Sequence, residues 1–292
     1  MSPGTSAVIA GLAQKRSINA ISCMAAASGW PVDSRLLAPL EAEGSAPAER
    51  VQIGLHLVLA SEVPLSAMSC QDAEGRLPGP DHILMLGLRR RLPLDEFAAE
   101  IDRQFIAFAG AMGRMPDFVD AHQHVHVVPG LRELVISATL RHAPHAWVRV
   151  PSDGLAAMLK RPFPGKAVGS AIQTLGFAGA LRRSGLAANS SFAGHYDFGD
   201  RFAEHLPHFF AGRSSRHLIM CHPGADDLPG DAIGKARRVE AEVLGGMTLS
   251  VMALKAVGGW SALYATSPNW HILPPANDPD FPWTQNLGGG IA

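Results

Sequence analysis

Continuous apolar runs alternate with amphipathic stretches along most of the chain. The runs are short and rich in Val, Ile, Leu and Ala, which predicts strands buried on both faces, as in a parallel sheet. They lie at 18–26, 51–60, 116–124, 146–151 and 217–224. Helical periodicity separates them, at 7–14, 94–113, 129–143, 166–185, 201–211 and 230–246. This alternation predicts an α/β protein whose parallel sheet is either open or closed into a barrel.

The same pattern predicts one domain and a tail. We expect a last strand at 258–265 and a single domain over 1–266, followed by a poorly ordered tail over 267–292 that is rich in Pro, Asn and Gly. The stretch 61–93 is rich in Pro, Gly and Arg and predicts a long loop after a strand. Together with 152–200, this loop is expected to set specificity, because variable loops over a rigid barrel usually do.

Composition narrows the class of protein. Hydrophobic residues make up 47% of the chain, charged residues 17%, and the formal net charge is -1, which argues against disorder and against a nucleic-acid partner. The three cysteines are far apart, so a reducing cytosol fits best. We find neither a signal peptide nor an apolar run long enough to span a bilayer, and therefore expect a soluble cytoplasmic protein without a membrane partner. A homodimer is compatible with the sequence.

Candidate chemistry is concentrated in "PDFVDAHQHVHVVPG", residues 116–130, where Asp120, His122, His124 and His126 occupy every second position. Side chains two apart in a strand share a face, so Asp120 and His122 project together, with His124 if the strand continues. The Pro-Gly pair that follows places them at the carboxyl end of the strand, where parallel α/β proteins gather functional groups.

Two other predicted strands also end in histidines, His56 in "GLHL" and His222 in "MCHPG". Any one histidine alone is more often structural, but three strands that bring imidazoles to one rim favour a divalent metal site that activates water. Asp120 could be a ligand, a partner that orients a liganding imidazole, or a carboxylate satisfied by backbone, and the second role is favoured. Arg149 could bind a substrate oxygen or form an ion pair. Tyr196 could cap or line the site.

These motifs resemble those of the YdjC-like (ChbG-type) carbohydrate deacetylases, which are related to the NodB-like polysaccharide deacetylases. The resemblance is carried by "IGLHLVLA", "PDFVDAHQHVHVVPGLRE", "RVP", "FAGHYDF" and "LIMCHPG", and runs from about Ser2 to Ala265. It implies a distorted (β/α) barrel that uses a divalent ion, magnesium or zinc, to remove acetyl groups from N-acetylated sugars or oligosaccharides. Metal-bound water would be the nucleophile.

Carried over position by position, the resemblance assigns His56 and His122 as metal ligands. His222 matches the histidine expected to protonate the departing amine, and His124 and His126 would line the pocket.

One part of the family pattern is absent from the sequence. The pattern begins with a strand that ends in two consecutive aspartates, which would supply the third ligand and the general base, whereas this chain has Met1 at that point. The Asp226–Asp227 pair lies in a predicted loop after His222 and is no substitute. We therefore expect a barrel without its first strand, and favour a misplaced start over an inactive sugar-binding or regulatory relative. A third class, an amidohydrolase, typically carries His-x-His on its first strand and ranks last.

Overall fold

The computed structural model of the protein describes residues 2–42, 50–210, 216–225 and 227–247, in which strands alternate with helices. The strands are β1 (Ala20–Cys23), β2 (Gln52–Leu57), β3 (Phe118–Ala121), β4 (Trp147–Val148), β5 (Ser191–Ala193) and β6 (His217–Ile219). The α-helices are α1 (Pro3–Gln14), α2 (Trp30–Asp33), α3 (Ala38–Ala42), α4 (Pro80–Leu88), α5 (Leu94–Met112), α6 (Leu131–His142), α7 (Leu155–Leu159), α8 (Pro164–Gln173), α9 (Phe177–Ser184), α10 (Phe202–Phe209) and α11 (Gly234–Gly245). Two 3-10 helices are η1 (Ser34–Leu37) and η2 (His122–Val127).

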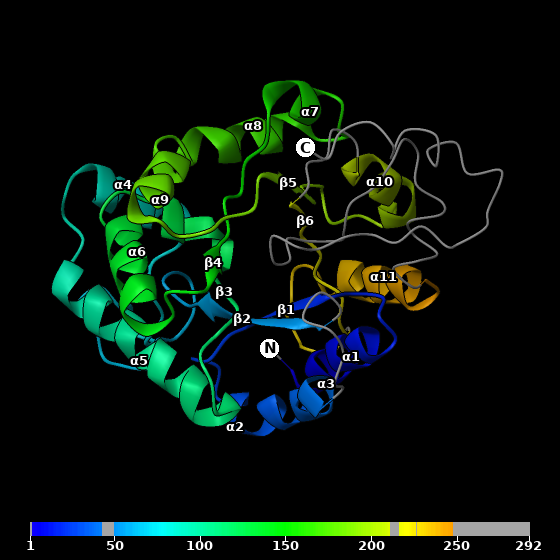
Figure 1. The fold of residues 1–292 in the computed structure, drawn as a ribbon, viewed down its shortest axis with the longest axis horizontal. Coiled ribbons are helices and arrows are strands. Elements are labelled where there is room, and N and C mark those ends of the chain that lie inside the picture. Colours follow the sequence, from blue (N-terminus) through cyan, green and yellow to red (C-terminus); the bar gives the residue numbers. More distant parts are fainter. Residues whose placement is uncertain (1, 43–49, 211–215, 226, 248–292) are drawn as a thin grey trace.

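The strands pair in parallel throughout the described residues. One sheet has the order β1-β2-β3-β4 and a second has the order β5-β6. A bridge between Val148 and Ala188 joins the end of β4 to the segment before β5. Figure 1 shows the helices as a ring around these strands, with α11 returning beside α1. The architecture is therefore the expected α/β fold, a distorted barrel in which the described part of β6 does not pair with β1.

Burial on both faces explains why β2 is almost wholly apolar. Ile53, Leu55 and Leu57 are completely buried, because neighbouring strands and surrounding helices cover both sides of the strand. Of its two polar residues, Gln52 is buried and accepts a hydrogen bond from the Trp147 indole, whereas 17% of the His56 side chain is exposed. A titratable side chain in such a strand needs a polar partner, and that partner is part of the site described below.

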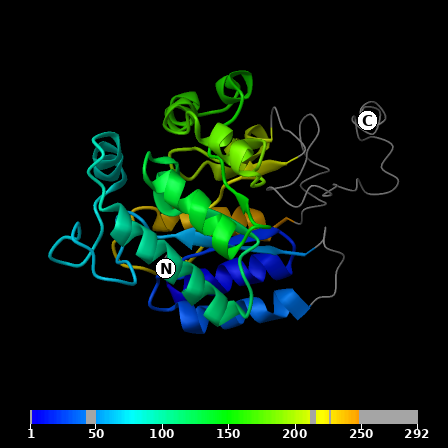
Figure 2. The same cartoon turned by 60° about the vertical axis from the view of Figure 1, so that its left-hand side comes forward.

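Helix α5 follows directly from its sequence pattern. Its buried face carries Phe97, Ile101, Phe105 and Phe108, at spacings of four, four and three residues, and each is fully buried. The helix ends where Gly113 adopts a left-handed conformation, φ 70°, as expected. Figure 2 shows α5 and α6 side by side on the outside of the strands.

A buried carboxylate fixes the start of the loop after β2. Glu100 of α5 is fully buried and accepts hydrogen bonds from the backbone N–H groups of Leu65 and Ser66, at 2.8 and 3.0 Å, and from the Ser66 hydroxyl at 2.6 Å. Beside it, Gln104 bonds both backbone polar groups of Val58, at 2.8 and 2.9 Å. The long loop is thus tied to the helix that covers β2, since these buried polar groups satisfy one another.

Two parts of the interpretation of the sequence were wrong. The stretch 61–93 is not loop throughout, because α4 occupies Pro80–Leu88, with a proline in its first turn. A strand, β5, lies within "NSSFAGHYDF", and α7 lies at Leu155–Leu159; the sequence analysis predicted neither, because three and five residues are too few to show a period. The predicted strand at 258–265 and the tail at 267–292 lie outside the described residues. No helix in the described part of the chain is long and apolar enough to cross a membrane.

The contact between β2 and β3 gives a testable prediction. A Cβ atom at Gly54 would overlap the ring of Phe118, which is itself stacked on Trp147 at a centroid distance of 4.5 Å. Gly54→Ala is therefore expected to lower the free energy of unfolding by about 1–3 kcal/mol, because the ring stack must shift in a filled core. Urea unfolding measures the change.

Gly110→Ala is the matched control. Gly110 lies inside α5, and a Cβ there meets nothing within 4 Å. The same substitution should leave the free energy of unfolding unchanged or raise it by up to about 1 kcal/mol, because alanine is the better helix former. Equal effects at both positions would show that the β2–β3 contact is looser than described.

Candidate functional site

One buried carboxylate contacts side chains from three neighbouring strands. Asp120 lies on β3 and is 2% exposed. Its Oδ1 accepts hydrogen bonds from the Ser22 hydroxyl of β1, at 2.5 Å, and from His56 Nδ1 of β2, at 2.7 Å. Its Oδ2 pairs with Arg149 Nη1, just after β4, at 2.6 Å. The strand register brings them together, since His56 lies directly opposite Asp120 across the β2–β3 ladder.

The electrostatics of this cluster keep Asp120 ionised. Burial alone would raise its pKa, but the charge of Arg149 and the hydrogen bonds from His56 and Ser22 together hold the pKa of Asp120 well below its usual range. Arg149 is engaged a second time, because its Nη2 donates to the Ala121 carbonyl at 2.6 Å. Of the two roles left open for Arg149, the structure shows the ion pair.

His56 and His122 face each other at the end of this cluster. Their ring centroids lie 5.7 Å apart in an edge-on arrangement. When Nδ1 of His56 donates to Asp120, its Nε2 keeps a lone pair, the state that a metal ligand needs. Burial, followed by the charges of His56 and Arg149, lowers the pKa of His122 to about 4, so the imidazole of His122 is neutral at pH 7. Asp120 thus holds the His56 ring through its Nδ1 atom.

The histidines after His122 point elsewhere, because the chain turns. Strand β3 ends at Ala121, and Gln123 and His124 adopt left-handed conformations with φ of 51° and 60° inside η2. The condition under which His124 would share the face of Asp120, a strand that continues beyond His122, is therefore not met. The turn is local, and nothing in an alternating pattern of histidines predicts it.

Ring contacts and one hydrogen bond show where His124 and His126 lie. The His124 ring packs edge-on against Phe192 at 5.7 Å and lies 5.9 Å from the ring of His195. His126 is fully buried, its Nε2 donates to the Arg149 carbonyl at 2.7 Å, and its ring meets Phe177. His126 therefore supports the backbone at Arg149, just after β4.

His222 approaches the same region from the loop after β6. Its pKa is lowered to about 3, by burial first, then by the charges of Arg237 and Arg149 and those of His56 and His122. The mutual effect of these imidazoles indicates that the three predicted strand ends converge. The Nδ1 atom of His222 is buried and has no hydrogen-bond partner among the described residues.

A second buried carboxylate holds His222 in place. Glu240 of α11 is fully buried, and its two oxygens accept hydrogen bonds from the His222 backbone N–H and from the Tyr196 hydroxyl. Burial raises the pKa of Glu240 to about 7. Tyr196 is 1% exposed, and it contacts His222 only indirectly, through the carboxylate of Glu240. The sequence analysis did not identify Glu240, Ser22 or His195 as part of the site.

The donors present suit a divalent cation but form an incomplete set. Neutral imidazoles bind zinc and other divalent transition metals, and His56 has the carboxylate partner typical of such a ligand. In the described residues, however, no group of three or more His, Cys, Asp or Glu side chains is arranged to hold an ion. Asp227 does not complete the set, because it accepts a hydrogen bond from Ser2, at 2.5 Å, beside the first turn of α1. Asp226 lies outside the described residues.

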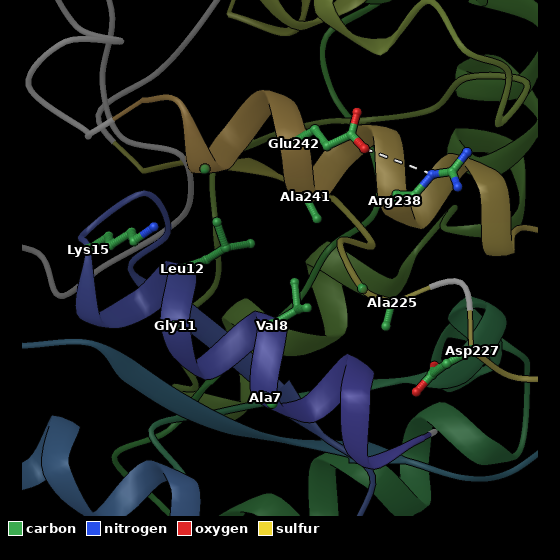
Figure 3. Close-up of a pocket in the computed structure, with 12 residues that line it drawn as sticks. Ala7, Val8, Gly11, Leu12, Lys15, Ala225, Asp227, Arg238, Ala241 and Glu242 are labelled. Atoms are coloured by element: carbon green, nitrogen blue, oxygen red, sulfur yellow. Dashed lines mark ion pairs between the residues drawn. The ribbon is translucent and has the colours of Figure 1, made fainter.

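A separate groove runs between α1 and α11 and contains none of this chemistry. It has a volume of about 610 Å³ and is lined mainly by small and apolar side chains, with Lys15 and the Arg238–Glu242 ion pair among its few charges (Figure 3). No histidine lines it. Asp120, His122 and His222, whose pKa values are shifted by neighbouring charged groups, lie at the strand ends instead. These strand ends are therefore the candidate site.

The fold has a counterpart among solved structures. The chain superimposes on a crystal structure from Enterococcus faecalis V583, described as a "putative cellobiose-phosphate cleavage protein", with a TM-score of 0.60. The alignment covers 83% of this chain and 85% of that one at 16% sequence identity. At this identity the likeness establishes a shared fold.

Sequence relatives are closer. A chitooligosaccharide deacetylase of Klebsiella pneumoniae (strain 342) is 30% identical over 206 residues, which are 70% of this chain and 73% of that protein. One from Enterobacter sp. (strain 638) is 38% identical over 89 residues, and the match spans only 34% of its length. The family model described as YdjC-like protein matches residues 1–252. This chain therefore belongs to the YdjC-like protein family.

Proposed function

We propose that the protein is a divalent-metal-dependent hydrolase that removes acetyl groups from N-acetylated sugars or oligosaccharides. The observation that carries the proposal is the pair of neighbouring imidazoles of His56 and His122. Asp120 forms a hydrogen bond with His56, and His222 lies in the same region. The relatives that bear the name chitooligosaccharide deacetylase support a carbohydrate amide as the substrate.

In this proposal, His56 and His122 hold the ion, and Asp120 fixes the His56 ring in the tautomer with a free Nε2. When bound, such an ion supplies a Lewis acid that polarises a carbonyl oxygen and makes water more acidic. Magnesium and zinc both remain candidates, and two imidazole ligands favour zinc, because magnesium prefers oxygen ligands.

His222 supplies the proton that amide cleavage requires. The departing amine leaves readily only when its nitrogen is protonated, and a positioned histidine can deliver that proton. Because the pKa of His222 is about 3, its ring is neutral at pH 7, and the proton that it passes to the amine must first come from the attacking water. The unpaired Nδ1 atom is free to accept it, and Glu240 keeps the residue in place through its backbone.

A second function, binding a sugar without turnover, is favoured by one observation. The described residues supply two imidazoles and no third side chain arranged as a ligand. In that case calorimetry detects an N-acetylated oligosaccharide binding to the protein, while added zinc or magnesium produces no acetate.

His122→Ala tests the proposed activity. The substitution is expected to lower kcat/KM for acetate release from an N-acetylated oligosaccharide by more than about 100-fold, because it removes a ligand outright, and even an indirect partner costs about 10–100-fold. Zinc affinity, measured by calorimetry, should fall in parallel. His145→Ala is the control, since His145 is exposed in a turn and should leave both quantities unchanged. Acetate release that survives the His122 substitution would refute the assignment.

The buried neutral histidines also predict how stability depends on pH. Burial lowers the pKa of His126 to about 3, against about 6.5 in an unfolded chain. Below pH 6.5 the unfolded state therefore binds a proton that the folded state refuses, and the free energy of unfolding falls as the pH drops towards 3. One such proton contributes a slope of about 1.4 kcal/mol per pH unit.

His126→Gln isolates this contribution. Glutamine keeps an N–H donor for the Arg149 carbonyl and does not titrate. Urea unfolding between about pH 6 and pH 4 measures how the free energy of unfolding changes with pH. In the variant this slope should be smaller than in the unsubstituted protein by about 1.4 kcal/mol per pH unit, the contribution of one proton. Identical slopes would mean that His126 is protonated equally in both states.

A further inference from the structure

A second pair of histidines lies beside the proposed reaction centre. His124 and His195 come from different parts of the barrel, η2 and the segment after β5, and their ring centroids lie 5.9 Å apart. Phe192 of β5 packs edge-on against both rings, at 5.7 and 5.3 Å. The proposed function uses neither histidine directly, so their arrangement needs its own explanation.

Both rings carry a buried nitrogen that lacks a partner. His124 Nδ1 and His195 Nε2 form no hydrogen bond within the described part of the chain, although each is inaccessible to solvent. Buried polar atoms without partners are uncommon in folded proteins, because desolvation costs free energy that no bond returns. Such atoms indicate a ligand or water that completes the hydrogen bonding.

The backbone at His124 is strained in a way that creates this pair. A left-handed conformation is unfavourable for a residue other than glycine, and here Gln123 and His124 adopt it in succession. The strain carries the His124 ring away from His122 and towards His195. Strain of this kind persists where the surrounding structure enforces it, often at binding sites.

The position of His195 is equally well defined. Gly194 precedes it with a φ of 108°, and a Cβ atom there would overlap the Met220 backbone next to β6. The close approach of β5 and β6 therefore requires glycine at 194 and places His195 at the carboxyl end of β5. Arg149, Arg161 and Lys166 are the charged groups that act on His195, and burial together with these cations keeps its ring neutral at pH 7, with a pKa of about 4.

An uncharged ligand rich in hydroxyl groups suits this pair. Neutral imidazoles can donate and accept hydrogen bonds, whereas the nearby cations disfavour a positively charged ligand. Phe192 adds an apolar surface against which a sugar ring can pack. Both histidines are partly exposed. A rotation of either imidazole by 180° about its Cβ–Cγ bond exchanges the positions of ring nitrogens and ring carbons and leaves the outline of the ring unchanged.

We propose that His124 and His195 form a sugar subsite, which binds the hydroxyl groups of the sugar unit next to the N-acetylated one. The inference rests on the proposed function, because it places the acetamide at His56, His122 and His222. It makes the protein selective for a disaccharide or longer chain over a monosaccharide.

Calorimetric titration with N,N′-diacetylchitobiose and with N-acetylglucosamine tests the subsite by binding alone. His195→Phe keeps an aromatic ring beside Phe192 and loses both nitrogens. We expect it to weaken disaccharide binding about tenfold, the effect of one lost hydrogen bond, and to change monosaccharide binding less than about twofold. His195→Gln restores a donor and an acceptor and should recover most of the disaccharide affinity.

His208→Phe is the matched control, since His208 is exposed on α10. It should bind both sugars as the unsubstituted protein does. Unchanged disaccharide affinity in His195→Phe, equal losses for both sugars, or no disaccharide binding by the unsubstituted protein would each overturn the subsite. Failure of the proposed function gives a different result: the disaccharide binds, the subsite stands, and zinc or magnesium produces no acetate.

Discussion

The buried charge of Asp120 is the constraint on which the rest of the site depends. A carboxylate that is 2% exposed must be neutralised and hydrogen-bonded, and here Ser22, His56 and Arg149 meet this requirement. These partners come from three other strands, so satisfying one charge fixes the relative positions of four strand ends. The same bonds orient His56 for its proposed role. Stability of the sheet and geometry of the site are therefore set by one set of contacts.

The other half of the barrel uses a second carboxylate in the same way. Glu240 of α11 binds the backbone of His222 after β6 and the hydroxyl of Tyr196 after β5. A buried acid thus fixes one histidine beside each of the two sheets. In the function proposed here, His56 and His122 at the end of the four-stranded sheet hold the ion, and His222 after the two-stranded sheet transfers the proton. The raised pKa of Glu240 fits a group whose environment is largely apolar.

The sequence predicted those features that depend on local patterns. Apolar runs located β2 and β3, helical spacing located α5, and the strand-end rule brought His56, His122 and His222 together. The alternating pattern also placed Asp120 on a strand, and β3 carries it.

Features that depend on tertiary contacts were missed for physical reasons. The left-handed turn at Gln123 and His124 is unfavourable locally and exists only because the surroundings enforce it. Ser22 carries no chemical signal in an apolar strand, and Glu240 is one of several acidic and basic residues in a helix of ordinary composition. His195 stood inside a motif that the sequence analysis noted, but a single histidine without a partner in sequence predicts no pair.

The most direct test of the account is the protonation of the His56 ring, read by NMR of protein labelled with nitrogen-15 in its imidazoles, at about pH 8 and without added metal. The His56 signals can be assigned by comparison with a His56→Gln variant. The contact with Asp120 predicts a proton on Nδ1 and a bare Nε2. A proton on Nε2 would contradict the central claim, because His56 would then be neither bound to Asp120 as described nor ready to hold an ion.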